Sequence, residues 1–199
     1  MRKKINSGKN GTFPAWRLLL AGFLLGVLLP NILWKMEWQQ QTMASMYLLG
    51  AFSGGEISGM DYLLEVVRMR GTYFLIAFFC GLSVFGVPLA ILWMAVTGIK
   101  IGALLTLSIL QFGLTGGAVG VGLLFPQYIL YLPVLAYFLS AVYAQSMEVW
   151  KNKGLFPQKV CRYAVVSALS GALYLGGILL EVYCNPWVVE MLIKKLKFL

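Results

Sequence analysis

Long apolar stretches are the feature that most constrains how this chain can fold. Between Thr72 and Met147 the only charged residue is Lys100, so any turns there are tight and no soluble loop fits. Over all 199 residues, 60% are hydrophobic and 12% are charged, whereas an ordinary soluble domain has about 45–50% apolar and about 25% charged residues. So few charges cannot cover that much apolar surface, and we therefore expect lipid to be the main solvent.

Five stretches are long enough to cross a bilayer, whose core of about 30 Å needs roughly 20 helical residues. We predict an all-α integral membrane bundle of five transmembrane helices, with short amphipathic helices at the interface. The predicted spans are residues 18–34, 72–97, 101–125, 128–147 and 164–184. Together they form a transmembrane domain over residues 18–185.

Segments outside these spans have their own patterns. Residues 1–17 form a basic N-tail, which we place in the cytoplasm. Residues 186–199 form a tail with apolar residues on one helical side and charges on another, a pattern typical of a helix lying in the headgroup plane. Residues 60–70, in the predicted outer loop, show the same pattern. Ordinary loop helices resting on the bundle stay an open alternative for both segments.

The basic residues predict the orientation. The chain has 16 Lys and Arg against 7 Asp and Glu, and cytoplasmic loops carry the excess of positive charge. Placing the N-terminus in the cytoplasm and the C-terminus outside puts most of the basic residues inside. We therefore predict a multi-pass protein of the cell membrane, whose first span is an uncleaved signal anchor rather than a cleaved export signal.

Residues that carry chemistry are scarce. The chain has no His, and its three Cys are scattered, which excludes His-based catalysis, a disulfide framework and the usual zinc sites. Glu56, Asp61 and Glu65 fall in the predicted outer loop, where a solvated face explains them better than an acid–base pair. We expect a protein that is not an enzyme, has no cofactor and no metal, and binds the lipid bilayer rather than nucleic acid.

Two ionisable residues fall in or beside the predicted spans. Lys100 is expected in the turn between the second and third spans. Glu181 is expected near the outer end of the fifth span, where its carboxylate can reach the interface. Intramembrane charges mark ion paths and substrate sites. With neither residue at the midplane, we do not expect a proton- or ion-coupled transporter.

Glycines recur four residues apart in the spans, as in Gly22 with Gly26 and Gly98 with Gly102. Small residues at this spacing let helix backbones approach closely. We expect them to pack helices within the bundle; a dimer seam, and with it a homo-oligomer, is the alternative. Further glycines of this kind in the third span are Gly113, Gly116 and Gly117.

Prolines punctuate the same region. Pro88 follows Gly86 inside the second predicted span, where a kink is expected. Pro126 can begin the fourth helix, Pro133 should bend it, and Gln127 could hydrogen-bond freed carbonyls. Broken membrane helices sometimes line a substrate site, although more often they only shape a bundle.

The order and spacing of these residues resemble stage II sporulation protein M, an integral membrane protein family. The likeness lies mostly in residues 85–144. Its elements are Gly86-x-Pro88, Gly98-x-x-x-Gly102, Phe112-Gly113-x-x-Gly116-Gly117 and Pro126-Gln127 followed by Pro133. The family pattern holds no catalytic residue, so the resemblance implies packing and kinking roles for these positions.

The resemblance implies a role rather than a reaction. Members of that family act as membrane anchors with stage II sporulation proteins D and P, which degrade peptidoglycan, during engulfment of the forespore. We therefore expect a membrane scaffold for such wall hydrolases in endospore formation. The alternative is a permease or channel-type subunit of a transporter, favoured by the kinked helices and the glycine-rich third span.

Overall fold

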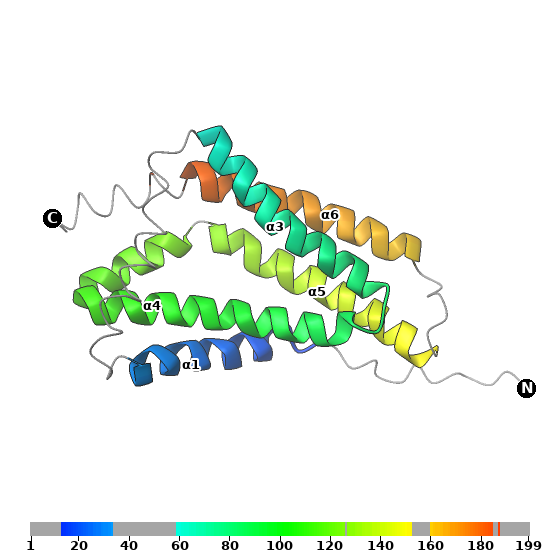
Figure 1. Ribbon diagram of the computed structural model, residues 1–199, viewed down its shortest axis with the longest axis horizontal. Coiled ribbons are helices and arrows are strands. Elements are labelled where there is room, and N and C mark those ends of the chain that lie inside the picture. Colours follow the sequence, from blue (N-terminus) through cyan, green and yellow to red (C-terminus); the bar gives the residue numbers. More distant parts are fainter. Residues whose placement is uncertain (1–12, 34–58, 126, 153–159, 185–186, 188–199) are drawn as a thin grey trace, which may run out of the picture.

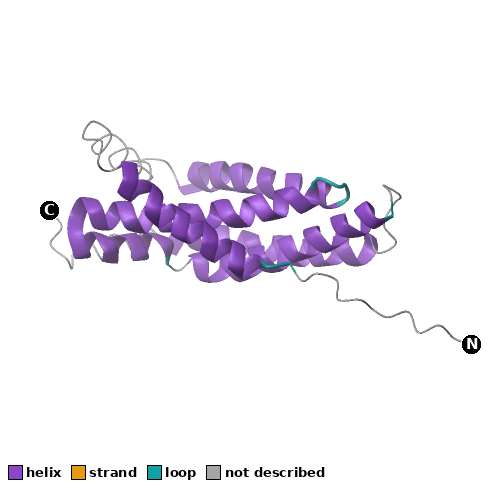
Figure 2. Cartoon of the chain, turned by 90° about the horizontal axis from the view of Figure 1, so that it is seen from below, coloured by secondary structure: helices purple, strands orange, loops and turns teal. Residues whose placement is uncertain are grey.

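The computed structural model describes residues 13–33, 59–125, 127–152, 160–184 and 187. Within these ranges the only regular secondary structure is helical (Figure 2). The bundle is elongated, with its helices running roughly along the long axis (Figure 1). The elements are α1 (Ala15–Leu33), α3 (Gly59–Gly81), α4 (Gly86–Leu124), α5 (Gln127–Lys151), α6 (Val160–Leu179) and a π-helical turn η2 (Leu180–Cys184).

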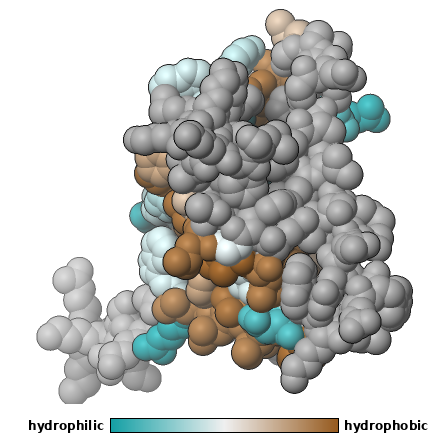
Figure 3. Space-filling model, turned by 90° about the vertical axis from the view of Figure 1, so that its left-hand side faces the viewer, coloured by the Kyte–Doolittle hydropathy of each residue, from teal (hydrophilic) through white to brown (hydrophobic). Residues whose placement is uncertain are grey.

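Four of the described helices are long and apolar enough to cross a membrane. Many large hydrophobic side chains on them are exposed, and the described surface seen from the end where α4 reverses is largely hydrophobic (Figure 3). The all-helical fold and a multi-pass membrane protein follow from these observations. The prediction of five spans is not confirmed. The candidate spans are Ala15–Ile32, Gly86–Leu110, Gln127–Lys151 and Val160–Cys184.

The second and third predicted spans differ from the helices of the structure. The stretch 72–97 is interrupted, because α3 ends at Gly81 and α4 begins at Gly86. The turn predicted at Lys100 is wrong, since α4 passes through that residue as helix. Hydropathy could not place the turn, because residues 82–85 are nearly as apolar as their neighbours and only Ser83 and Gly86 favour a turn.

A buried serine on α5 holds this turn. Ser146 Oγ donates to the Ser83 carbonyl (2.6 Å) and accepts from the Val87 N–H (3.1 Å). It therefore satisfies one of the N–H groups at the start of α4, a helix whose own N-cap supplies no side-chain bond. Pro88 lies in the first turn of α4, where its missing N–H does no harm. At Pro88 the structure therefore has the start of a helix and not the predicted kink.

The predicted interfacial helix 60–70 is the first part of α3 rather than a separate element. It continues without a break into apolar residues that the sequence assigned to a span. The first part of α3 carries four charged residues, and for this reason the helix does not qualify as a span by hydropathy. Of the other predicted segments, the N-tail up to residue 12 and the C-terminal tail from 188 onward lie outside the described residues.

The chain reverses direction within α4 at Gly113. This residue has φ 66° and ψ −153°, a conformation essentially restricted to glycine. A Cβ on Gly120 would lie 2.8 Å from Ser108 Oγ, although a straight helix would separate these two residues by about 18 Å. The second arm, residues 114–124, therefore folds back along the first, as Figure 1 shows at one end of the bundle.

Contacts at helix ends fix the helix directions. We call the end that holds residues 82–85 the turn end, and the opposite end the Gly113 end. Phe13 contacts Tyr143 with ring centroids 5.2 Å apart, and the Tyr163 hydroxyl donates to the Phe78 carbonyl (2.8 Å). Thus α1, α4 and α6 begin at the turn end, whereas α3 and α5 finish there.

The core lies where α3, α4, α5 and α6 meet. Phe138, Leu139 and Val142 of α5 and Met94 of α4 are completely buried. Phe74 of α3 stacks on Phe138 with centroids 4.0 Å apart. Because α5 is the most buried of the candidate spans, it is the central helix on which the others pack.

Replacing Gly113 with Ala should destabilise the fold by about 1–3 kcal/mol, because a Cβ is strained at that backbone conformation although the space around it is open. Gly71→Ala is the matched control: its surroundings are also open, but its backbone is helical, so Ala should be neutral or stabilise by about 0.5–1 kcal/mol. Unfolding of the two variants in detergent micelles, followed by circular dichroism, measures both. Equal stability of the two would contradict the reversal at Gly113.

Candidate functional site

The glycines at four-residue spacing in α1 and α4 face each other. A Cβ on Gly26 would lie 2.8 Å from Ile99 Cα, and one on Gly98 would lie 2.8 Å from Phe23 N. Gly22 likewise meets the Ala95 carbonyl, and Gly102 meets the Phe23 carbonyl. The two backbones touch directly in a parallel arrangement, as Figure 1 shows for the helices. These glycines therefore pack helices within one chain, and the contact between α1 and α4 occupies the face that a dimer seam would use.

A polar cluster joins α3, α5 and the π-helical turn. Arg70 of α3 forms a salt bridge with Glu181 of η2. The Tyr131 hydroxyl of α5 donates to the other carboxylate oxygen of Glu181 (2.8 Å). The Arg70 guanidinium carbon lies 4.9 Å from the centre of the Tyr131 ring, within range of a cation–π contact. Three helical elements are thus tied together by one carboxylate.

This cluster corrects the loop position expected for Arg70 and adds a partner for Glu181. Arg70 lies within α3 rather than in a loop, and Glu181, near the end of the candidate span Val160–Cys184 as expected, is paired with Arg70 rather than free. Their side chains are 29% and 11% exposed, so both charges are largely removed from solvent. Such charges are tolerated when they pair with each other and their remaining hydrogen-bonding groups are satisfied. The π-helical turn, an element often found at functional sites, carries Glu181. Sequence spacing gave no signal for a pair 111 residues apart.

Lys100 is exposed in the middle of a helix that is long enough to span a membrane. The parallel register of α1 and α4 places Gly26 beside Ile99, so Lys100 lies about ten residues past the level of Arg17. At 1.5 Å per residue this is about 15 Å, or half of a bilayer core. The helix register thus places Lys100 well inside the candidate span Gly86–Leu110 rather than in the predicted turn.

The remaining motif residues lie in several places rather than in one site. Gly86 begins α4 against Ser146, and Gly117 faces Ile109 across the reversal. Gln127 is buried at the start of α5, and α5 continues as one helix through Pro133. Gly116 lies in the returning arm of α4, whereas Pro126 lies outside the described residues.

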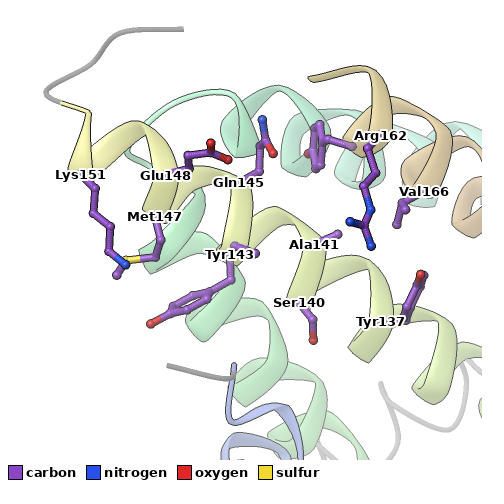
Figure 4. Close-up of a pocket in the computed structure, with 12 residues that line it drawn as sticks. Tyr137, Ser140, Ala141, Tyr143, Gln145, Met147, Glu148, Lys151, Arg162 and Val166 are labelled. Carbon is purple, nitrogen blue, oxygen red and sulfur yellow. The ribbon is translucent and has the colours of Figure 1, made fainter. Parts of the chain in front are cut away.

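A groove of about 550 Å³ lies between α5 and α6 at the turn end (Figure 4). Arg162 of α6 extends into the space between the two helices, and Lys151 and Glu148 stand at the end of α5. Gln145 is 6% exposed, and its Nε2 has no hydrogen-bond partner among the described residues. No sequence signal marks this groove, because its residues come from two helices and share no motif.

The described residues contain no group of three His, Cys, Asp or Glu side chains that could hold a metal ion. Comparisons of the chain with protein-family models, with curated protein sequences and with solved structures find no match. The described residues offer four features that bear on function: the backbone contact between α1 and α4, the Arg70–Glu181 pair, the exposed Lys100 and the groove lined by Arg162.

Gly98→Ala should destabilise the protein by about 1–3 kcal/mol, because its Cβ would collide with backbone atoms of α1 that cannot move alone. Gly171→Ala is the control, since its Cβ would meet only the Phe74 ring at 3.4 Å, an ordinary contact. Thermal unfolding in micelles distinguishes them. A Gly98 variant as stable as the Gly171 variant would show that the two backbones are not in contact.

Glu181→Gln should destabilise the bundle by about 1–3 kcal/mol, since it leaves the Arg70 charge, which is largely but not completely removed from solvent, without a counter-charge. The double variant Arg70→Met, Glu181→Gln should recover part of that loss, because no unpaired charge remains. Arg68→Gln, an exposed cation of the same helix, should change little. A double-mutant cycle of unfolding free energies measures the coupling, and additive losses would argue against the pair.

Proposed function

We propose that this protein is a membrane scaffold, which acts by holding a partner protein within the bilayer. The observation that carries the proposal is the exposed Lys100 on α4, a charge on the outer surface of a spanning helix. A charge near the bilayer centre costs about 2.5–3.5 kcal/mol on insertion scales. A carboxylate on a neighbouring membrane helix at the same depth would offset that cost and so favour association.

The paired interior charges support the same function. Arg70 and Glu181 neutralise each other, and the Tyr131 hydroxyl bonds to the same carboxylate. Their partners lie on three different elements, so the interaction stabilises the arrangement of helices. A group that carries protons must exchange its hydrogen-bond partners. In this cluster both carboxylate oxygens of Glu181 already have a partner, which is typical of a structural interaction.

The helix directions support an orientation with five passes. Because α1 and α4 both begin at the turn end, the chain must return between them, and α3 runs in the required direction. We infer that α3 is this return pass despite its polar first part. Arg17, Lys151 and Arg162 lie toward the turn end, and the excess of such residues is characteristic of the cytoplasmic side. The N-terminus is then cytoplasmic and the C-terminus extracytoplasmic, in the cell membrane.

The partner class comes from the resemblance to stage II sporulation protein M. On that basis we propose that the scaffold anchors peptidoglycan-degrading proteins similar to stage II sporulation proteins D and P during forespore engulfment. The extracytoplasmic side of the proposed orientation is the side on which such hydrolases meet the cell wall.

A transporter subunit is the second candidate, and the reversal of α4 at Gly113 is the observation that favours it. Half-helices that enter and leave on one side of a membrane surround substrate sites in some transporters. Reconstituted vesicles test this function: a solute or ion flux that depends on the protein and is abolished by Gly113→Ala would favour transport over scaffolding.

Deleting the protein should leave the partner hydrolases active in solution but displaced from the engulfing membrane, because only their anchor is lost. Lys100→Leu should displace them as well, at least severalfold by quantitative fluorescence of a tagged hydrolase, while the variant itself still inserts and folds. Arg68→Gln is the matched control and should leave localisation unchanged. Normal hydrolase localisation in the deletion strain would refute anchoring; normal localisation with Lys100→Leu alone would refute the role of Lys100.

A further inference from the structure

We propose that the groove between α5 and α6 binds an anionic phospholipid from the leaflet at the turn end, with the lipid phosphate on Arg162. This site is separate from the surface around Lys100, which lies on α4, and it does not depend on the scaffold function. Its ligand is defined by two chemical features, an anionic phosphate and an acyl chain.

The phosphate assignment rests on Arg162. Its guanidinium extends from α6 into the space between the helices (Figure 4), and the salt bridge found among the described residues involves Arg70 rather than Arg162. A guanidinium binds phosphate oxygens in a bidentate manner through its planar fork. Lys151 adds positive potential at the end of the groove, where Glu148 contributes the opposing charge.

The shape of the groove favours a lipid over a soluble anion. It runs along α5 from Lys151 to Tyr137, which is about 21 Å of helix. Lys151 and Glu148 stand at the end of α5, whereas the Arg162 guanidinium lies farther along the groove, beside Val166 and near Ala141 (Figure 4). Both walls are helices that qualify as membrane spans, so the neighbouring phase is hydrocarbon. An acyl chain fits this position, whereas a free phosphate would occupy only a small part of it.

Native mass spectrometry and thermal unfolding of the full chain in detergent test the proposal, with phosphatidylglycerol, phosphatidylcholine and inorganic phosphate as probes. We expect phosphatidylglycerol to bind and raise the unfolding temperature, and to bind about tenfold more tightly than phosphatidylcholine, since loss of a charge-assisted hydrogen bond is worth about that factor. Inorganic phosphate at the same concentration should give no comparable shift.

Two variants and a control complete the test. Arg162→Gln removes the phosphate ligand, and Val166→Trp fills the groove without changing its charge; both should weaken phosphatidylglycerol binding about tenfold. Arg68→Gln removes an exposed cation from α3 and should bind as the unmodified protein does. Equal binding of the two lipids, an equal shift with inorganic phosphate, or undiminished binding by both groove variants would overturn the proposal.

Discussion

A bilayer core contains no water to hydrogen-bond a polar group, and this constraint shapes each polar contact inside the bundle. Glu181 uses both of its carboxylate oxygens, one for Arg70 and one for the Tyr131 hydroxyl. Ser146 uses its hydroxyl both as a donor and as an acceptor, and so closes the turn between α3 and α4. Each of these contacts joins segments that are distant in sequence. The groups that lipid cannot satisfy are therefore the groups that fix which helices are neighbours.

The same solvent explains why glycine, rather than leucine, holds α1 in place. Lipid tails are as apolar as a leucine side chain, so burying leucines between helices gains little, and close backbone packing has to supply the attraction. The face of α1 that carries Gly22 and Gly26 lies on the backbone of α4. Its leucines, such as Leu20, Leu24 and Leu28, remain more than half exposed. In water these exposed leucines would promote aggregation. In lipid they contact acyl chains that are as apolar as they are.

How much the sequence could predict depends on the range of each signal. The apolar composition predicted the helical membrane class, and the four-residue glycine spacing indicated the packing faces, because both signals are local. The turn at residues 82–85 has almost no polar signal of its own and is held by Ser146, which lies 63 residues from Ser83. The Arg70–Glu181 pair likewise joins residues that only the fold brings together. Gly113 was recognised as a packing glycine, but its positive φ depends on the returning arm, which no spacing rule predicts.

The exposure of Lys100 is the observation on which the preference for a scaffold over a transporter rests. Charges within membrane spans almost always face the bundle interior or a water-filled cavity, where they serve conduction or catalysis. A transporter would place its charged residue there. Lys100 is instead exposed, while the interior charges of α3 and η2 are already paired. Glu181 is not available as a counter-charge for Lys100, because its carboxylate is engaged with Arg70 and Tyr131. Under the proposed function, the anion that pairs with Lys100 comes from a partner protein, and this is the arrangement expected of a protein that holds a partner in the membrane.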